Sequence, residues 1–283
     1  MRQLEAHERA ETHDERGNVR VPQTLTHRGA STLAPENTLA ALSTAVELGV
    51  DYVEIDVHMT ADDELVVIHD RTVDRTTNGT GPVRTFDLWE LKRLDAGSWF
   101  YRPGAIPAWE RSLLRVPTLR EALDVVRGRA GVCIEIKKPD LYPGLEQRLL
   151  DILHDAGMLE GEAARSVMLQ SFSVGSMRLL ALLAPQLTRI QLVLPGHSIT
   201  EGELDRLRGY AHGLGLHRGS VTRDLVRQAH DRDLLVHPYT VNSPEEMRRL
   251  LDLDVDGIIS DNPVELKRVI REFIVDRQLS LHS

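Results

Sequence analysis

The sequence predicts an α/β fold, a closed (β/α)8 barrel of the TIM type. Strand-like runs alternate with helical runs along most of the 283 residues, and eight such units can be counted. No GxGxxG follows the first predicted strand, which argues against the runner-up, an open doubly wound sheet. The predicted strands end near positions 27, 56, 137, 171, 194, 216, 241 and 260. Functional residues of such barrels lie at these ends.

The composition is that of an ordinary soluble protein, with 41% hydrophobic and 27% charged residues. A net charge of −9 argues against a nucleic-acid partner, and no run of about 18 apolar residues predicts a transmembrane segment. The single cysteine, Cys133, excludes an internal disulfide, and we expect it to fill the barrel interior. Residues 1–20 are highly charged without an apolar core, so we expect a tail rather than a secretory signal, and a cytoplasmic protein.

The first unit begins with a strand over Val21–Thr26, which leads into the loop His27-Arg28-Gly29. Pro35-Glu36 is expected to open the following helix, because proline is tolerated in a first helical turn. Apolar residues at helical spacing continue this helix, and Gly49 marks its end.

A hairpin over Val50–Asp70 is the stretch around which the other motifs are arranged. Its first strand alternates, which places Glu54 and Asp56 on one face and apolar residues on the other. His58 shares the carboxylate face and is a weaker candidate for the site.

The return strand of the hairpin is expected to deliver a histidine to the same face. The segment Ala61–Glu64 has turn composition. If Asp62 and Asp63 form a two-residue loop, His69 lies opposite Asp56. Two carboxylates and one imidazole then converge in a small space.

The remaining units continue the alternation. Predicted strands cover residues 131–137, 166–172, 189–194, 213–216, 234–241 and 257–260. Predicted helices cover residues 145–156, 175–183, 201–208, 222–231, a segment that starts after Ser243, and 263–274. Ser243 is expected to cap its helix, with Glu246 completing a capping box.

Residues 71–117 break the rhythm and are predicted to form a small subdomain inserted after the hairpin. Half of the chain's twelve aromatic residues lie here: Phe86, Trp89, Trp99, Phe100, Tyr101 and Trp109. We expect most of these rings to form an aromatic mini-core. The alternative is a lid that contacts substrate, in which a ring could hold a choline group by cation–π attraction.

Seven residues at the predicted barrel mouth could carry chemistry: His27, Arg28, Glu54, Asp56, His69, Glu135 and Lys137. Three carboxylates suit one hard divalent cation, Mg²⁺ or Ca²⁺, that can also bind a phosphate. The arginine and the lysine can donate to phosphate oxygens, and the two histidines can divide acid and base work. The set predicts phosphodiester hydrolysis, although each charged pair alone could be a plain salt bridge.

The order and spacing of these motifs resemble the glycerophosphodiester phosphodiesterase family over roughly residues 23–272. The motifs that carry the resemblance are His27-Arg28-Gly29, Pro35-Glu36-Asn37-Thr38, Glu54-x-Asp56, His69-Asp70 and Glu135-x-Lys137. The insertion after His69-Asp70 is also a mark of that family, and it is absent from the bacterial phosphatidylinositol phospholipases C that share the barrel.

The resemblance implies a Mg²⁺- or Ca²⁺-dependent enzyme that cleaves a small glycerophosphodiester to glycerol 3-phosphate and an alcohol. It implies that the metal ligands are Glu54, Asp56 and Glu135. The implied base is His27 and the implied acid is His69, with water or the substrate's own 2-hydroxyl as the attacking group. Arg28 and Lys137 would hold the phosphate, and Asn37 would support the site.

The late strands depart from the family pattern in two places. Tyr239 stands where the family often has tryptophan, ahead of Thr240-Val241-Asn242, and the last strand ends in Ser260-Asp261-Asn262-Pro263 rather than Thr-Asp-x-Pro. We expect Tyr239 and Asn242 to support the site, and these changes to affect the alcohol half of the substrate.

The domain organisation is predicted to be one catalytic barrel over residues 21–275, which carries the 71–117 subdomain, and a C-terminal tail over 276–283. Two other functions stay open at this point. One is cleavage of lipid-tailed diesters, as in lysophospholipase D or sphingomyelinase D. The other is a non-catalytic module that binds phosphodiesters.

Overall fold

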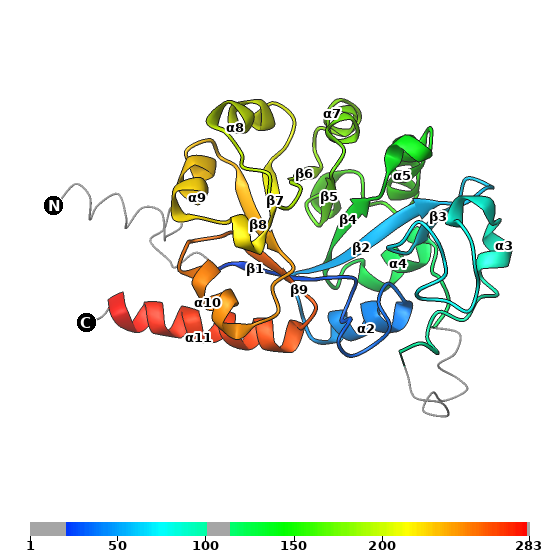
Figure 1. Cartoon of the computed structure of the whole chain (residues 1–283), viewed down its shortest axis with the longest axis horizontal. Helices are drawn as coiled ribbons and strands as arrows, with labels where there is room; N and C mark the ends of the chain where they lie inside the picture. The colour runs from blue at the N-terminus through cyan, green and yellow to red at the C-terminus, as the bar shows by residue number, and fades with distance from the viewer. Residues whose placement is uncertain (1–20, 101–113, 282–283) are drawn as a thin grey trace.

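Eight parallel strands follow one another around a nearly closed barrel in the computed structural model, which describes residues 21–100 and 114–281. The strands are β1 (Gln23–Thr26), β2 (Tyr52–Met59), β4 (Gly131–Ile136), β5 (Val167–Ser171), β6 (Thr188–Leu192), β7 (Gly213–His217), β8 (Leu235–Tyr239) and β9 (Gly257–Ser260). Their order is β8-β7-β6-β5-β4-β2-β1-β9 (Figure 1). Backbone hydrogen bonds from Val241 to Ile259 (2.9 Å) and from Asp256 to Val236 (3.0 Å) join the two ends. The predicted (β/α)8 barrel is confirmed.

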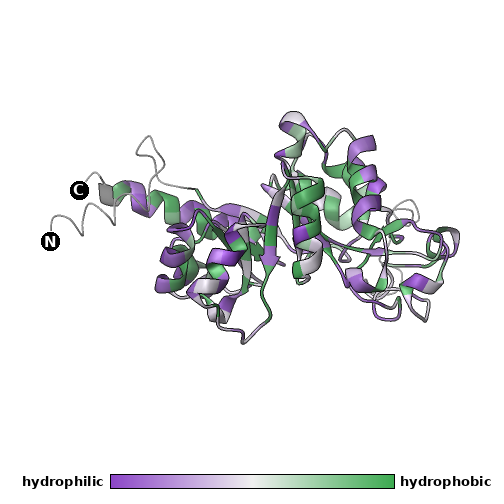
Figure 2. Ribbon diagram, turned by 90° about the horizontal axis from the view of Figure 1, so that it is seen from above, coloured by the Kyte–Doolittle hydropathy of each residue, from purple (hydrophilic) through white to green (hydrophobic). Residues whose placement is uncertain are grey.

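Helices cover the outside of the strands. They are α2 (Leu39–Glu47), α4 (Leu119–Val126), α5 (Leu145–Asp155), α6 (Gly161–Ala164), α7 (Val174–Leu183), α8 (Glu201–Arg208), α9 (Arg223–His230), α10 (Pro244–Leu251) and α11 (Pro263–Leu281). The strands carry much of the hydrophobic sequence, and most helices carry both hydrophobic and hydrophilic stretches (Figure 2). No helix in the described ranges is long and apolar enough to cross a membrane.

Alternate residues of each strand point to opposite faces of the sheet and pack in two different clusters, one against the helices and one inside the barrel. Val53, Ile55 and Val57 of β2 lie in a large apolar cluster with helix residues. The opposite face of the strands points into the barrel, where Cys133 packs in a small cluster with Met168 and three other buried apolar side chains. Cys133 is therefore interior filler, as expected, and the other inward positions of β2 are left for polar groups.

Two helix boundaries differ from the prediction. The first helix begins at Leu39 rather than at Pro35, because Asn37 has a left-handed backbone (φ 55°) that a helix cannot include. Thr38 caps it instead, accepting a hydrogen bond from the Ala41 amide. The last helix runs to Leu281, so it includes most of the segment predicted as a C-terminal tail. The predicted tail over residues 1–20 lies outside the described residues.

Ser243 caps α10 as predicted, accepting a hydrogen bond from the Glu246 amide at 3.1 Å. The reciprocal half of the capping box is not made, because the Glu246 carboxylate pairs with Arg218 at 2.7 Å.

The hairpin register is one residue away from the prediction. Strand β3 (Leu65–Val67) pairs antiparallel with β2, with Val57 opposite Val67, so Ile68 rather than His69 lies across from Asp56. The connection is a three-residue loop in which Asp63 is left-handed (φ 59°). A one-residue slip moves side chains to the other face of a ladder. His69 still reaches the mouth, because the strand has ended and His69 lies in the bend that follows it.

The segment predicted as an inserted subdomain shares a small, mainly aliphatic core with the end of the hairpin, where Val66 and Ile68 lie. Its members include Val73, Val83, Leu91 and Val116, with Phe86 packed against them, and the short helix α3 (Leu88–Leu91) lies over them. Trp89 and Trp99 are 59% and 42% exposed, so the predicted aromatic mini-core is wrong for these two rings. Tyr101 and Trp109 lie outside the described residues.

The hairpin loop gives a test of the register. We expect Asp63→Val to lower the free energy of unfolding by about 1–2 kcal/mol, because a β-branched residue is strained in the left-handed region. Asp63→Gly is the matched control and should leave it within about 0.5 kcal/mol, since glycine adopts this conformation freely. Chemical denaturation measures both. Equal values for the two variants would contradict the left-handed loop.

Candidate active site

Three acidic side chains on neighbouring strands meet inside the barrel mouth. Glu54 and Asp56 point inward from β2, and Glu135 points inward from β4, in register with Asp56. One oxygen of each carboxylate lies within 4.8 Å of the others, and all three residues are buried. We call this set the acidic triad. Period-two alternation along two paired strands suffices to bring these groups together.

Burial and mutual repulsion make full ionisation of the acidic triad unfavourable when no cation is bound. Burial, reinforced by Asp56, raises the pKa of Glu54 to about 8. Burial also raises the pKa of Glu135, and Lys137 offsets only part of the shift. The pKa of Asp56 shifts in the opposite direction. Burial would raise it, but Lys137 and Arg28 outweigh burial and hold the pKa well below the usual range. Three buried oxygen donors with unbalanced charge fit a hard divalent cation.

His27 sits at the end of β1 and is held between an acid and an arginine. Its Nδ1 lies 2.6 Å from Oδ1 of Asp261, and the Arg28 Nε donates to its Nε2 at 3.2 Å. Because arginine only donates, the imidazole in this arrangement is neutral, with its proton on Nδ1 and a lone pair on Nε2. Burial lowers the pKa of His27, but Asp261 and Glu54 outweigh it and raise the pKa overall. The side chain is therefore a strengthened base.

Asp261 is a site residue that the sequence interpretation did not select. Its second oxygen accepts a hydrogen bond from Asn242 at 2.6 Å, and Ser31 donates to the first at 3.3 Å. Asn242 was predicted to support the site. It lies at the site and fixes the carboxylate of Asp261. The position of Asp261 directly after the last strand was the signal that could have identified it.

His69, which follows β3, has a parallel arrangement. Its Nδ1 lies 2.7 Å from Oδ1 of Asp70, and Arg75 grips both oxygens of Asp70 at 2.7 and 3.0 Å. Burial lowers the pKa of His69. Beneath it, the ring of His58 contacts the His69 carbonyl oxygen at 3.1 Å and the Tyr142 hydroxyl at 2.8 Å. Burial lowers the pKa of His58 to about 4, so this ring is neutral and positions the His69 backbone.

One arginine joins the two histidine environments. Arg75 also binds both oxygens of Glu36, at 2.8 and 2.9 Å, and Glu36 accepts from Arg28 at 2.7 Å. The resulting chain runs from Asp70 through Arg75 and Glu36 to Arg28, which contacts His27. Arg75 and Glu36 were not predicted as site residues. They are 39 positions apart, and no local pattern indicates that they meet.

The loop that follows β1 has a strained backbone, and it contributes Arg28 and Glu36 to this series of ion pairs. Arg28 and Asn37 have left-handed backbones (φ 59° and 55°), which are uncommon for residues other than glycine. Gly29 between them has φ 81°, and a Cβ there would come within 2.8 Å of the Ala41 backbone. The glycine is needed for close approach of this loop to α2.

The predicted phosphate-binding residues are ion-paired with the acidic triad. Lys137 Nζ lies 2.7 Å from Glu135 and 3.0 Å from Asp56, and Arg28 Nε lies 3.5 Å from Asp56. Asn37, predicted as support, donates at 2.8 Å to Oδ2 of Asp56, the oxygen that also faces Arg28, whereas Lys137 faces Oδ1.

Gln170 and Tyr239 also lie at strand ends. Gln170, at the end of β5, donates to Glu54 at 3.2 Å. Tyr239, predicted as support, donates instead to the Val193 carbonyl oxygen at 2.6 Å, and its ring packs edge-on against Phe172. Tyr239 thus supports the wall of the mouth rather than a member of the acidic triad.

Comparison with known proteins identifies the family. The family model described as the glycerophosphoryl diester phosphodiesterase family matches residues 27–265. The chain belongs to this family. A glycerophosphodiester phosphodiesterase of Bacillus subtilis is 40% identical over 258 residues, covering 88% of this chain and 87% of the relative. One of Caldanaerobacter subterraneus subsp. tengcongensis is 38% identical, covering 88% and 97%.

Solved structures of the family have the same fold. A phosphodiesterase of Oleispira antarctica, in complex with the product sn-glycerol-3-phosphate, matches with a TM-score of 0.78 and 29% identity over 89% of this chain and 97% of that one. A glycerophosphodiester phosphodiesterase of Agrobacterium tumefaciens matches with a TM-score of 0.72 and 32% identity, over 87% and 98%. This chain is accordingly an enzyme, a phosphoric diester hydrolase.

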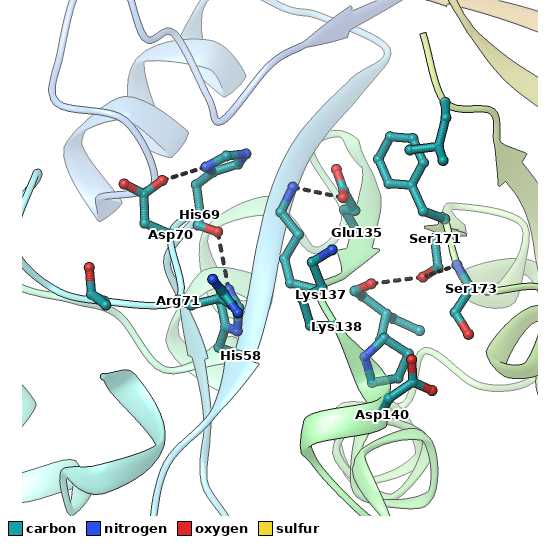
Figure 3. Close-up of a pocket in the computed structure, with 15 residues that line it drawn as sticks. His58, His69, Asp70, Arg71, Glu135, Lys137, Lys138, Asp140, Ser171 and Ser173 are labelled. Atoms are coloured by element: carbon teal, nitrogen blue, oxygen red, sulfur yellow. Dashed lines mark hydrogen bonds and ion pairs between the residues drawn. The ribbon is translucent and has the colours of Figure 1, made fainter. Parts of the chain in front are cut away.

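In this phosphodiesterase a pocket of about 640 Å³ opens beside His69 and runs over the ends of β4, β5 and β6 (Figure 3). Its lining residues are His58, His69, Asp70, Arg71, Thr72, Glu135, Ile136, Lys137, Lys138, Pro139, Asp140, Ser171, Phe172, Ser173 and Leu194. His69, Glu135 and Lys137 are thus the predicted residues that face it. His27, Arg28, Glu54 and Asp56 adjoin it without lining it. Trp89 and Trp99 do not line it either, which does not support a lid formed by these two rings.

The His27–Asp261 pair gives a pH-dependent test. We expect Asp261→Asn to lower kcat by about 10²–10⁴-fold, as happens when the orienting carboxylate of a histidine base is removed. A base works only when unprotonated, so its pKa sets the acidic limb of the kcat/KM profile. Asp261 raises that pKa, so the limb should move to lower pH in the variant. Asp256→Asn is the control, because its pair with His230 (2.9 Å) lies away from the mouth. An unmoved limb in Asp261→Asn would contradict the assignment.

The bridging arginine gives a second test. We expect Arg75→Lys to lower kcat/KM about 10–100-fold, because a point charge cannot hold two carboxylates by two bonds each. Unfolding should change little, since Arg75 is partly exposed. Arg93→Lys, in the same subdomain beside Trp89, should retain full activity. Equal kinetics for the two variants would show that the bridge has no part in catalysis.

Proposed function

We propose that this enzyme hydrolyses glycerophosphodiesters to sn-glycerol 3-phosphate and an alcohol, with a divalent cation and two histidines. The observation that carries the proposal is the buried acidic triad together with two histidines, each held by a carboxylate. The Oleispira antarctica relative, which was solved with sn-glycerol-3-phosphate as its product, supports the choice of product. The barrel over residues 21–275 would be the catalytic domain.

Glu54, Asp56 and Glu135 would hold the cation, Mg²⁺ or Ca²⁺. Its chemistry would be to neutralise charge on the phosphate as the transition state forms. A cation on these oxygens would compete with Lys137, which now pairs with two of the three carboxylates. The lysine ammonium and the Arg28 guanidinium would then be available to phosphate oxygens.

His27 would act as the base and His69 as the acid. The Nε2 lone pair of His27 now accepts from the Arg28 Nε, and it would become available when Arg28 turns to the phosphate. It would then take the proton of the attacking group, either water or the substrate's 2-hydroxyl; attack by the hydroxyl would give a cyclic phosphate that water then opens. The Nε2 of His69, with Nδ1 occupied by Asp70, would return a proton to the leaving alkoxide. The raised pKa of His27 makes it a stronger base, and the lowered pKa of His69 makes it a stronger acid.

One observation favours the lipid-tailed alternative. Phe172 and Leu194, at the far end of the pocket, are 38% and 65% exposed, and a neighbouring hollow of about 310 Å³ shares both residues. An acyl chain could lie there. Choline release from lysophosphatidylcholine would identify this activity. The binding-only alternative is not supported, since the chain belongs to an enzyme family and retains both histidines and the acidic triad.

The deciding experiment measures sn-glycerol 3-phosphate released from glycerophosphocholine and glycerophosphoethanolamine, with Mg²⁺, with Ca²⁺ and with EDTA. We expect release that EDTA abolishes, and a rise in Tm when the cation is added. Glu54→Gln should remove the rise in Tm. His27→Ala and His69→Ala should lower kcat by about 10²–10⁴-fold while keeping that rise.

His154→Ala, at an exposed position, is the matched control and should keep full activity. Near-normal turnover in both site variants would contradict the roles of the histidines. Activity that persists in EDTA would contradict the cation, and no release from either substrate would contradict the proposed reaction.

A further inference from the structure

Two cations in the pocket beside His69 are not engaged by the charge network of the mouth. Arg71 and Lys138 both line the pocket. Within residues 21–100 and 114–281, neither side chain makes a hydrogen bond or an ion pair with another residue. Arg28, Arg75 and Lys137 are different, since each is bound to two carboxylates. A cation that already has carboxylate partners does not need a ligand to balance its charge. Arg71 and Lys138 have no such partner among the described residues, so they are available to bind a ligand.

The backbone directs Lys138 into the pocket. Consecutive residues of a strand point to opposite faces, so Lys137 and Lys138 would be separated if β4 continued. Lys138 instead adopts a left-handed conformation (φ 45°), and its carbonyl oxygen accepts from the Leu141 amide in the 3-10 helix Pro139–Leu141. The result is that both lysines face the same space (Figure 3). A left-handed lysine at the mouth is a strained feature of the kind found at binding sites.

The charges that face these cations leave the pocket positive. Three carboxylates line it. Asp70 is held by Arg75 and His69, and Glu135 is held by Lys137, so neither is free to neutralise the pair. Asp140 is the remaining acid, one negative charge against two positive ones. The hydroxyl group of Ser173 also lines the pocket and can donate to an anion.

The pocket lies beside His69. The role of His69 therefore indicates which part of the substrate enters the pocket. If His69 protonates the leaving oxygen, as in the proposed function on which this inference rests, the alcohol half extends away from His69 into the pocket. We propose that Arg71 and Lys138 form a subsite for an anionic group on that half, a phosphate or a carboxylate. A choline group would meet two cations there, and of the described aromatic side chains that could hold it, only Phe172 and the neutral His58 line the pocket.

The test compares glycerophosphoglycerol, whose alcohol half is neutral, with the same molecule carrying a terminal phosphate. Glycerophosphoserine supplies a carboxylate, and glycerophosphocholine a cation. We expect kcat/KM to be about tenfold higher for the phosphorylated substrate than for glycerophosphoglycerol at low salt, because each exposed ion pair contributes up to about fivefold. The ratio should shrink as salt is added. Glycerophosphocholine should be the poorest of the four.

Charge-removing variants connect the preference to these residues. In the double variant Arg71→Gln, Lys138→Gln, the tenfold ratio should fall to about one, and turnover of glycerophosphoglycerol should stay within about twofold of the parent. Asp140→Asn is the matched control in the same wall and should keep or increase the ratio. Because the readout is a ratio of two substrates, a general loss of folded enzyme does not mimic the effect.

The outcomes separate the two proposals. Turnover of all four substrates with no preference for the anionic ones overturns the subsite and leaves the proposed function intact. A preference that survives in the double variant overturns the assignment to Arg71 and Lys138. No turnover of any substrate overturns the proposed function itself. Preference for the phosphate alone, without glycerophosphoserine, identifies a phosphate subsite; preference for both identifies a general anion subsite.

Discussion

The burial of three carboxylates within 4.8 Å of one another is the constraint on which the mouth of this barrel depends. Charged groups are costly to bury unless they are paired and hydrogen-bonded. Asp56 pairs with Lys137 and accepts a hydrogen bond from Asn37. Glu54 accepts hydrogen bonds from the Arg28 amide and from Gln170. The first loop accepts left-handed residues so that its polar groups can reach these oxygens. Even so, the raised pKa of Glu54 shows that the compensation is incomplete, as suits a cation site.

The two histidines are built on the same plan with different partners. Each has its Nδ1 against a carboxylate, and the Nε2 of His27 accepts a hydrogen bond from Arg28. Asp261 is fixed by an amide and a hydroxyl, whereas Asp70 is fixed by an arginine. The contacts from Asp70 through Arg75 and Glu36 to Arg28 connect the two histidines, so the proposed acid and base are positioned by one network. Preorganisation of this kind reduces the reorganisation needed at the transition state.

The mouth is thereby divided into a closed part and an open part. In the closed part, Asp56 and Glu135 are paired with Lys137, whereas the charge of Glu54 is only partly compensated. In the open part, which runs over the ends of β4 to β6, Arg71 and Lys138 have no carboxylate partner among the described residues. In our proposals, the first part carries the chemistry and the second part selects the alcohol, so substitutions in the open part would change specificity without disturbing catalysis.

The sequence by itself determined the barrel, the inward direction of Glu54 and Asp56, and the burial of Cys133, because hydrophobic alternation fixes which strand face points inward. Only the tertiary structure decided the hairpin register, since it depends on the left-handed Asp63 and a three-residue loop. The same holds for the contacts of Asp261 with His27 and of Arg75 with Glu36. These residues lie far apart in the chain, and loop conformations that no local periodicity encodes bring them together.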